Sequence, residues 1–475
     1  MFDPDIAPSG SLLGLLQRGR GDGPLHALAA PRAEALAALE QCVLRDPRLD
    51  WRVESRSLYY ARLYSDLEGP LDGIEHHLFA VDDLLNPDEH RCGLALSVLG
   101  HLAGYGRQDA LRLLRRYAAT GSCWSWALDE LAVRDDDAGL RGLGPAVVGR
   151  FPATPEGDAD LARAVREAYE PRPWRLWAED AAGPAIAARL RRAAERGSFD
   201  RWQRQLRPGG PAPGWGVGAV LEWAEEGLAC HPAVERDQAA ARLLASVAGA
   251  EDRPALLRAA VDGPSAARAA ALRHLSDRRD PQALDLLEAA ASAIDARVVR
   301  AAAESLERRR DEPALARARR WADRGDALGL AAARTLARHG GSEDAGLVLA
   351  ALRRTVQRGG ADAEGLDALV EGAGRLASCA AAPVLRHLYR ETSSSQLRGA
   401  AARALSAVDP GFAAGFAVEC LWDCEESTRE LAAHTAASGD VRVLTQLRRL
   451  AADPAEEVEV QTAVRGRLSS GGSAR

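Results

Sequence analysis

The stretch ALRHL at 271–275, followed after a short turn by DPQAL at 280–284, decides the fold of this 475-residue chain. Two further pairs repeat the pattern: AESL at 303–306 with DEPAL at 311–315, and RTL at 334–336 with SEDAGL at 342–347. The anchor leucines Leu275, Leu306 and Leu336 lie 31 and 30 residues apart. This period is too long for one helix and suits two short helices with their turns, so it predicts a solenoid of helix pairs.

The small residues and leucines of these units resemble HEAT repeats, in the short bacterial form named after the phycobilin lyases. The resemblance covers 230–466 well and 50–150 less closely, where Leu102 and Leu131 still lie 29 residues apart. It implies an all-α fold, a right-handed superhelical α-solenoid of HEAT-like helix pairs. Because that family contains mostly binding scaffolds and few enzymes, the resemblance says much about fold and little about activity.

Breaks in the rhythm divide the chain into five expected parts. They are an N-terminal helical cap at 1–50, HEAT-like repeats at 51–151, an irregular Trp/Pro-rich connector at 152–235, a second repeat array at 236–466 and a disordered tail at 467–475. The connector contains RPGGPAPG at 207–214, which is too rich in Pro and Gly for a helix and predicts a long loop. An insertion at 354–365 lengthens one period, and such insertions map to loops on one edge, often near a binding surface.

An Asp or Asn followed by Pro recurs along the chain, at 46–47, 86–87, 280–281, 409–410 and 453–454. Asp or Asn can cap the free amides of a first helical turn, and Pro at the first helical position loses no hydrogen bond. These dipeptides therefore predict helix starts and no functional sites.

Composition agrees with an all-α fold and limits the chemistry. Apolar residues make up 47% of the chain and aromatic residues only 5%, the excess being Ala and Leu. All 61 basic residues are arginine, which excludes a P-loop lysine, a Schiff-base lysine and a lysine general base. The net charge of −7 gives no sign of a basic face for nucleic acid, so we expect no nucleic-acid partner.

The cysteines and the hydropathy indicate a cytoplasmic protein. Seven scattered cysteines suggest no disulfide framework. The acidic stretch at 1–5 lacks the positive charge of a signal peptide, and no apolar run approaches the roughly 18 residues of a membrane span. We expect a cytoplasmic location without membrane association, and the sequence leaves the oligomeric state open.

A regular Asp-to-Arg spacing of six residues spans several turns. It joins Asp109 with Arg115, Asp252 with Arg258, and Asp311 with Arg317. These positions resemble the ladder that a turn aspartate and a helix arginine form between neighbouring HEAT units. The alternative is an exposed charge on each helix, and both interpretations are structural rather than functional.

Two groups of side chains are the candidates for partner binding. Half of the tryptophans fall in the connector: Trp174, Trp177, Trp202, Trp215 and Trp223. Tryptophan is a common binding hot spot, although in an Ala-rich chain it also fills gaps in the core. Arg309 and Arg310, with Arg319 and Arg320, could contact phosphate or an acidic protein, although charged helix faces are usual in solenoids.

Metal and redox chemistry find little support. Glu75, His76 and His77, with Asp82 and Asp83 and then 88–92 (DEHRC), could gather ligands, but adjacent histidines point about 100° apart on a helix. We interpret this segment as a solvated helix edge. Cys420 and Cys424 share a helix face without two further ligands nearby, so we expect buried small apolar side chains. No cofactor and no metal is predicted.

Enzymatic candidates rest on looser patterns. Trp124, Trp126 and Asp129 are similar in type to the aromatic residues and carboxylate of alkylpurine DNA glycosylases built from HEAT-like repeats, although the spacing differs. A carboxylate there would stabilise a developing oxocarbenium charge. No Gly-x-Ser-x-Gly elbow is present, so nucleophilic catalysis has no anchor.

The leading interpretation is a non-catalytic scaffold or adaptor that binds another protein on its concave face, with arginines contacting carboxylates. The alternatives are an enzyme on a HEAT-like scaffold, which would be a base-excision glycosylase or a bilin-type lyase, and nucleic-acid binding without catalysis.

Overall fold

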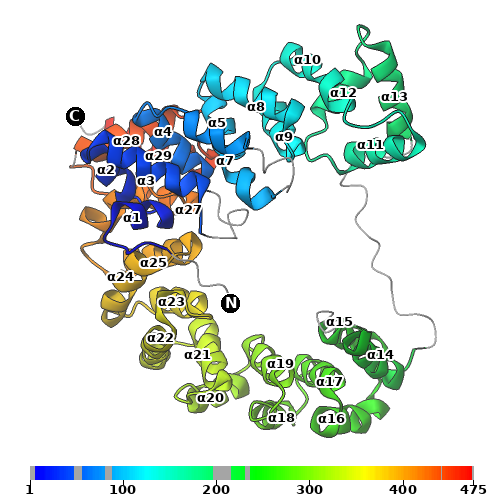
Figure 1. The fold of residues 1–475 in the computed structure, drawn as a ribbon. Coiled ribbons are helices and arrows are strands. Elements are labelled where there is room, and N and C mark those ends of the chain that lie inside the picture. The colour runs from blue at the N-terminus through cyan, green and yellow to red at the C-terminus, as the bar shows by residue number, and fades with distance from the viewer. Residues whose placement is uncertain are drawn as a thin grey trace. The chain divides into compact units, whose positions relative to one another are not determined.

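The fold was examined in a computed structural model, which describes residues 6–47, 56–80, 88–195, 215–230, 236–439 and 441–472. Throughout those ranges the regular secondary structure is helical (Figure 1). The chain forms two compact units. The first comprises Met1–Leu206, Ser393–Gln396 and Gly411–Arg475, and the second comprises Arg207–Thr392 and Leu397–Pro410.

The first unit contains helices from both ends of the sequence. They are α1 (Leu12–Arg18), α2 (Asp22–Ala29), α3 (Arg32–Leu44), α4 (Ser57–Asp66), α5 (Asp72–Leu78), α7 (Glu89–Gly104), α8 (Gln108–Thr120), α9 (Trp124–Arg134), α10 (Asp137–Val148), α11 (Pro155–Glu167), α12 (Arg172–Ala178), α13 (Pro184–Glu195), η6 (Phe412–Ala414), α26 (Phe416–Cys420), α27 (Glu426–Thr435), α28 (Val441–Ala452) and α29 (Val458–Gly472).

The second unit contains the helices between them. They are α14 (Val217–Cys230), α15 (Asp237–Val247), η2 (Ala250–Asp252), α16 (Arg253–Asp262), α17 (Ser265–Asp277), α18 (Ala283–Ala290), α19 (Ala296–Glu307), α20 (Glu312–Trp321), α21 (Ala327–His339), η3 (Ser342–Asp344), α22 (Ala345–Gly359), η4 (Gly360–Asp362), α23 (Leu366–Arg375), η5 (Cys379–Ala381), α24 (Ala382–Glu391) and most of α25 (Ser395–Val408).

The second unit is a stack of helix pairs, which confirms the predicted α-solenoid. Along the stack α15, α17, α19, α21 and α23 pack on one another in order, while α16, α18, α20 and α22 each pack on the helix that follows. The anchor leucines Leu275, Leu306 and Leu336 are all buried in this stack. The period of about 30 residues in the sequence is therefore the period of the packing.

Small side chains allow the stacked helices to approach closely. A Cβ atom added at Gly372 in α23 would lie 2.4 Å from the Cβ atom of Ala337 in α21. One added at Gly374 would lie 2.8 Å from the Cα atom of Ala404 in α25. The abundance of Ala and Gly in this chain thus reflects helix crossings with no room for larger groups.

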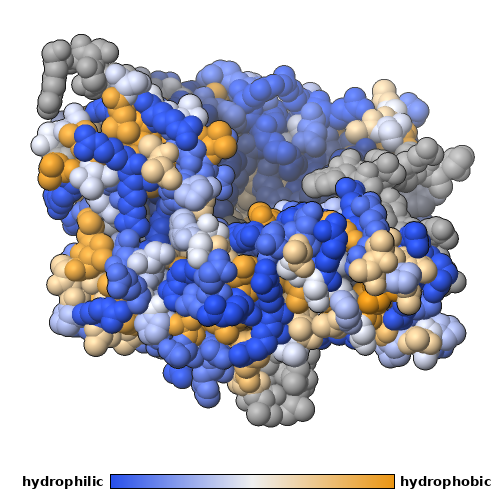
Figure 2. All heavy atoms as spheres, turned by 90° about the horizontal axis from the view of Figure 1, so that it is seen from above, coloured by the Kyte–Doolittle hydropathy of each residue, from blue (hydrophilic) through white to orange (hydrophobic). Residues whose placement is uncertain are grey.

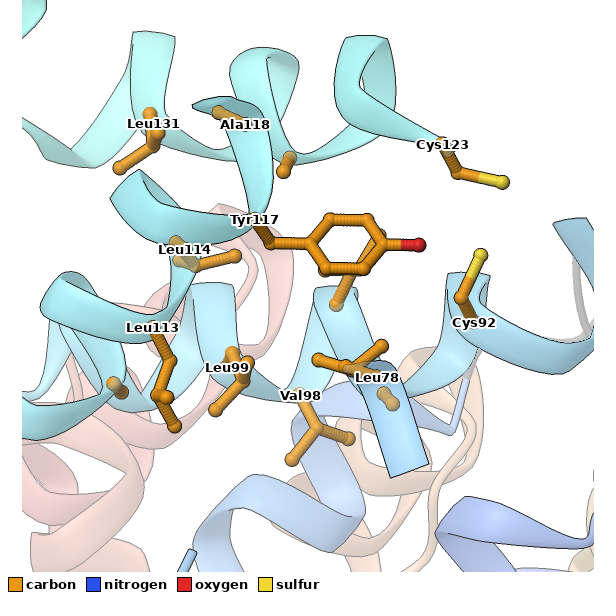
Figure 3. Close-up of a cluster of buried hydrophobic side chains, with 14 of the residues drawn as sticks. Leu78, Cys92, Val98, Leu99, Leu113, Leu114, Tyr117, Ala118, Cys123 and Leu131 are labelled. Carbon is orange, nitrogen blue, oxygen red and sulfur yellow. The ribbon is translucent and has the colours of Figure 1, made fainter. Parts of the chain in front are cut away.

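The core of the first unit follows the same rule but includes aromatic side chains (Figure 3). Tyr117 in α8 is fully buried and meets Phe79 edge-on at 5.7 Å between ring centroids. Its hydroxyl lies 3.4 Å from the Ser122 hydroxyl. The ring extends across Gly121, where an added Cβ atom would lie 2.5 Å from three ring carbons.

Helices from the two ends of the sequence pack together in the first unit (Figure 1). The Arg62 guanidinium in α4 donates to Asp453 at 2.8 Å and to Glu456 at 2.9 Å. Arg429 in α27 donates to the same Glu456 at 2.6 Å. The Tyr105 hydroxyl donates to Asp453 at 3.0 Å. These groups form a largely buried charged network, in which the Glu456 side chain is 0% exposed.

The structure differs from the predicted divisions in three places. The connector forms helices α11 to α13 where it is described up to Glu195, and the predicted loop at 207–214 lies outside the described residues. Helix α29 continues to Gly472, past the predicted start of the tail at 467. The insertion at 354–365 forms the end of α22 and η4.

The prediction that Asp-Pro dipeptides start helices is wrong at Asp453, which directly follows α28 and precedes a turn. Asp409 lies three residues before the start of η6, the same spacing as Asp280 before α18. Asp453 accepts the Ala455 backbone N–H at 2.9 Å, which stabilises a turn rather than a helix start. At Asp280 the same contact, to the Gln282 N–H, immediately precedes α18.

No helix in the described ranges combines the length and the apolar character that a bilayer crossing requires.

Candidate functional site

Large apolar side chains are exposed singly rather than in one broad patch. In Figure 2 the hydrophobic colour is broken into small areas among hydrophilic residues on the face in view. Among the described residues, those strongly exposed are Leu28, Val133, Tyr169, Val261, Ile294, Val441 and Val458. Scattered apolar residues of this kind are normal on a protein surface, so concave sites are more informative.

A groove of about 850 Å³ lies in the second unit, at the turn that joins α16 to α17. Its apolar lining consists of Leu221, Ala259, Pro264 and Ala267. Its charged lining consists of Glu222, Glu225, Glu226, Asp262 and Arg258. Four carboxylates against one guanidinium give the groove an acidic rim around an apolar floor.

Helix α14 places its acidic residues on this side because of their spacing. Glu225 and Glu226 lie three and four residues after Glu222, and both of these spacings place side chains next to Glu222 on the helix surface. Glu225 has a structural role, since its Oε1 accepts the backbone N–H groups of Ala266 at 2.5 Å and Ala267 at 2.9 Å and so caps α17. Glu222 and Glu226 are exposed and remain available at the rim.

Two predicted tryptophans, Trp215 just before α14 and Trp223 within it, are not in the lining of this groove. Trp215 and Trp223 meet edge to face at 5.8 Å between ring centroids, and both are partly exposed. The Arg236 guanidinium lies 5.0 Å from the Trp223 ring centroid and donates to the Trp223 carbonyl at 3.3 Å. Trp202 lies outside the described residues.

The prediction of an exposed binding role is wrong for Trp177, which belongs to the core of the first unit. Its side chain is 1% exposed, and its Nε1–H donates to the Leu140 carbonyl at 2.7 Å. Trp174 is 2% exposed and packs on Trp177 with ring centroids 5.2 Å apart. Gap filling in an Ala-rich core explains Trp177 and buries most of Trp174.

Trp174 also lines a pocket of about 350 Å³ between α9, α11 and α12. The lining consists of Trp124, Ser125, Leu128, Asp129, Ala164, Glu167, Ala168, Tyr169 and Trp174. Two members of the glycosylase-like pattern, Trp124 and Asp129, therefore share one pocket. Trp126 is not in this lining, and its Nε1–H donates to the Ser97 hydroxyl at 3.3 Å.

Two of the four predicted partner-binding arginines are engaged within the chain. Arg309 donates to Asp311 at 2.6 Å and is 8% exposed. Arg319 donates to Asp344 at 2.8 Å, and this hydrogen bond is the main reason that its pKa is raised. Arg310 and Arg320 are exposed. In this cluster, Arg310 and Arg320 are therefore the arginines most accessible to a partner.

The predicted ladder pairs have other partners. Asp109 accepts from Arg107, and Asp311 accepts from Arg309, in each case two residues earlier. These hydrogen bonds lower the pKa of both carboxyl groups. The tripeptide Arg-x-Asp also occurs at 20–22 and 324–326, where the arginine again pairs with the aspartate. This tripeptide is therefore the sequence pattern that predicts the local ion pair.

The helix arginines of the ladder reach different acids. Arg115 pairs with Asp135 at 2.5 Å, and Arg317 pairs with Asp285 at 2.7 Å. The Asp252 carboxylate accepts the Gly249 backbone N–H at 2.9 Å. Its expected partner, Arg258, lines the acidic groove instead.

The weak metal and redox candidates lie in ordinary packing contacts. His77 Nε2 lies 2.8 Å from the Arg91 carbonyl oxygen, and Glu75 pairs with Arg116 at 2.7 Å. Asp82 and Asp83 lie outside the described residues. Cys420 is buried, as predicted, whereas Cys424 is partly exposed.

The sequence-based candidates in this segment are Trp215 and Trp223, and they do not include the groove residues. The stretch LEWAEEG at 221–227 contains the readable signal, an apolar residue with three acids on one helix face. Arg258 and Asp262 line the same groove because α16 packs near α14. The spacing of residues within one helix does not reveal such packing between helices.

Comparisons with known proteins add a structural likeness. No family model matches the chain, and no curated protein matches it. Among solved structures it is similar to Kap121p, with a TM-score of 0.32 and 12% identity over 96% of this chain and 53% of that one. The chain therefore spans about half the length of Kap121p. The stacked helix pairs of the second unit themselves define the fold as an α-solenoid.

Proposed function

We propose that this protein is a non-catalytic HEAT-repeat scaffold that binds another protein through the concave surface of its helix stack, with the acidic groove at α14 as an anchor point. We also place it in the phycobilin-lyase-type group of such repeats and in the cytoplasm. The observation that carries the proposal is the groove of about 850 Å³, which combines an apolar floor with exposed carboxylates.

The charges of the groove define the partner. Glu222, Glu226 and Asp262 are exposed, whereas Glu225 caps α17. A partner segment with an apolar side chain flanked by Lys or Arg would cover the floor and pair with the rim. Such pairs raise the association rate and set specificity more than they add affinity. This assignment reverses the sequence-based expectation of an acidic partner held by arginines.

The test is affinity purification of the tagged full chain from the cells that make it, followed by mass spectrometry. The variant Glu222→Arg/Glu226→Arg reverses the rim without touching the cap at Glu225. The matched control is Glu371→Arg, an exposed acid on α23 outside the groove lining. We expect a stoichiometric protein partner with wild type and control, reduced at least tenfold by the double reversal.

Two outcomes would overturn the proposal. One is elution of the protein alone or with nucleic acid. The other is a partner retained equally by the double reversal, which would remove the groove from the contact surface.

Base excision on a HEAT-like scaffold is the second candidate, and one observation favours it. Trp124, Asp129 and Trp174 line a single pocket, which provides the residue types that hold a cationic alkylated base. The check is release of free base from alkylated DNA by wild type and by Asp129→Asn. Activity lost in the variant would support this candidate over the scaffold.

A further inference from the structure

The pocket of the first unit has aromatic walls that meet nearly at right angles. The rings of Trp124 and Trp174 lie 6.2 Å apart between centroids at an interplanar angle of 74°. Tyr169 follows α11 and is 70% exposed. Covering an exposed aromatic ring with a ligand would remove apolar surface from water and so favour binding. Three aromatic side chains thus border one space of about 350 Å³.

The charged lining residues of this pocket are both acidic, Asp129 from α9 and Glu167 at the end of α11. Asp129 is held in position because its Oδ1 accepts the Glu170 backbone N–H at 3.1 Å. The same contact fixes the segment that carries Tyr169. A carboxylate and an exposed aromatic ring are therefore positioned together by one hydrogen bond.

A basic group beside Trp124 is already engaged. The Arg150 guanidinium lies 5.7 Å from the Trp124 ring centroid and does not line the pocket. It donates to the Gly121 carbonyl at 2.9 Å. Its charge is thus directed toward a backbone oxygen on another element, and the pocket lining itself stays acidic.

We propose that this pocket binds an alkylammonium group. Aromatic rings attract a cation that lies within about 6 Å of the ring centroid, and an alkylated ammonium loses little hydration on entering. A carboxylate adds a Coulomb attraction that a neutral group of the same shape cannot gain. The proposal is independent of the groove at α14, because the two sites lie in different units.

The test compares a cation with its neutral isostere on the full-length protein. Choline and 3,3-dimethylbutan-1-ol have the same shape and differ in the charged atom. Isothermal titration with each, supported by tryptophan fluorescence, measures both affinities. We expect choline to bind at least tenfold more tightly, and Asp129→Asn to weaken choline binding at least tenfold.

Controls separate binding from folding. Asp160→Asn removes an exposed acid of α11 outside the pocket and should leave choline binding unchanged. Tyr169→Ala truncates an exposed ring and should weaken binding several-fold without unfolding, as circular dichroism would verify. Equal binding of the neutral isostere, or unchanged choline binding in Asp129→Asn and Tyr169→Ala, would overturn the proposal.

The source of the group is resolved by two further probes. A peptide containing trimethyl-lysine that binds more tightly than choline would assign the pocket to a side chain of a protein partner. Equal affinities would assign it to a small free cation. Tighter binding of DNA containing an alkylated base than of either probe would overturn the proposal in favour of base excision.

Discussion

Replacing Arg62 by Met tests whether the buried charged network joins the helices from the two ends of the sequence. The Arg62 side chain is 13% exposed and pairs with Asp453 and Glu456, which are 7% and 0% exposed. Burial alone would lower the pKa of Arg62, but the two acids outweigh it and raise the pKa. The guanidinium is therefore held in its charged form, and Met would keep the aliphatic length without the charge.

The expected cost is about 3 kcal/mol. Removing one partner of a buried ion pair typically costs 3–5 kcal/mol, because the remaining charge is left uncompensated. The lower end applies here, since Arg429 still donates to Glu456 at 2.6 Å. A loss of about 3 kcal/mol corresponds to roughly a hundredfold larger open population, because each 1.4 kcal/mol is a factor of ten.

Hydrogen exchange read by mass spectrometry is the suitable assay, because it reports local opening in a chain of two units. Amides of α28 and α29 should exchange about a hundredfold faster in Arg62→Met, while those of the second unit stay unchanged. The matched control is Arg163→Met, which removes a pair whose side chains are 60% and 54% exposed. Exposed pairs contribute about 0–1 kcal/mol, so the control should exchange almost as wild type does. Equal effects of the two variants would refute the reasoning.

Three further predictions concern the first unit. Gly121→Ala should lower the free energy of unfolding by about 1–3 kcal/mol, because the added Cβ atom overpacks against the Tyr117 ring. The control is Gly142→Ala, whose added Cβ atom has no other atom within 4 Å, and it should change the stability little. Urea titration measures both variants. Burial, and then nearby arginines, lower the pKa of His101 to about 4. The unfolded state therefore binds more protons between pH 4 and 6.5, and stability should fall by up to about 3 kcal/mol as pH drops through that range. Melting temperatures measured over this pH range should fall less in His101→Gln than in wild type. An equal fall in both proteins would contradict this explanation. Trp177→Phe should cost about 1–3 kcal/mol by leaving a buried carbonyl without its donor, as measured by chemical denaturation.

The helix pairs could be predicted because their signal is local. Each anchor leucine recurs within about 30 residues, and burial of Leu275, Leu306 and Leu336 follows directly from that spacing. The handedness of the superhelix remains a prediction, since it depends on small rotations between pairs that composition does not encode.

The contacts of charged residues could not be predicted in the same way. Arg62 and Asp453 are 391 positions apart, and no periodicity indicates which helix face meets which. The ladder prediction failed for a related reason. A turn aspartate such as Asp311 is satisfied by the arginine two positions earlier, so the helix arginine reaches another acid.

The candidate sites were only partly readable. The acids of α14 share a helical face that the sequence displays, but their role depends on the neighbouring turn at Gly263. In the other pocket, Trp124 and Asp129 lie on one helix, whereas Tyr169 and Trp174 come from later segments. A hydrogen bond from the Glu170 amide brings them together, and no pattern of side-chain types predicts such a contact.

The pairing of Arg62 with Asp453 and Glu456 has a consequence for how the protein is made. At a synthesis rate of about 5–20 residues per second, helix α4 leaves the ribosome roughly 20 to 80 s before α28 does. During that interval its guanidinium lacks its native acidic partners. A solenoid whose pairs contact only their neighbours could fold from its first repeat onward during translation. Here the ion pairs of Arg62 must wait for the last helices, so nascent chains halted before residue 411 should be the preferred targets of cellular chaperones and proteases.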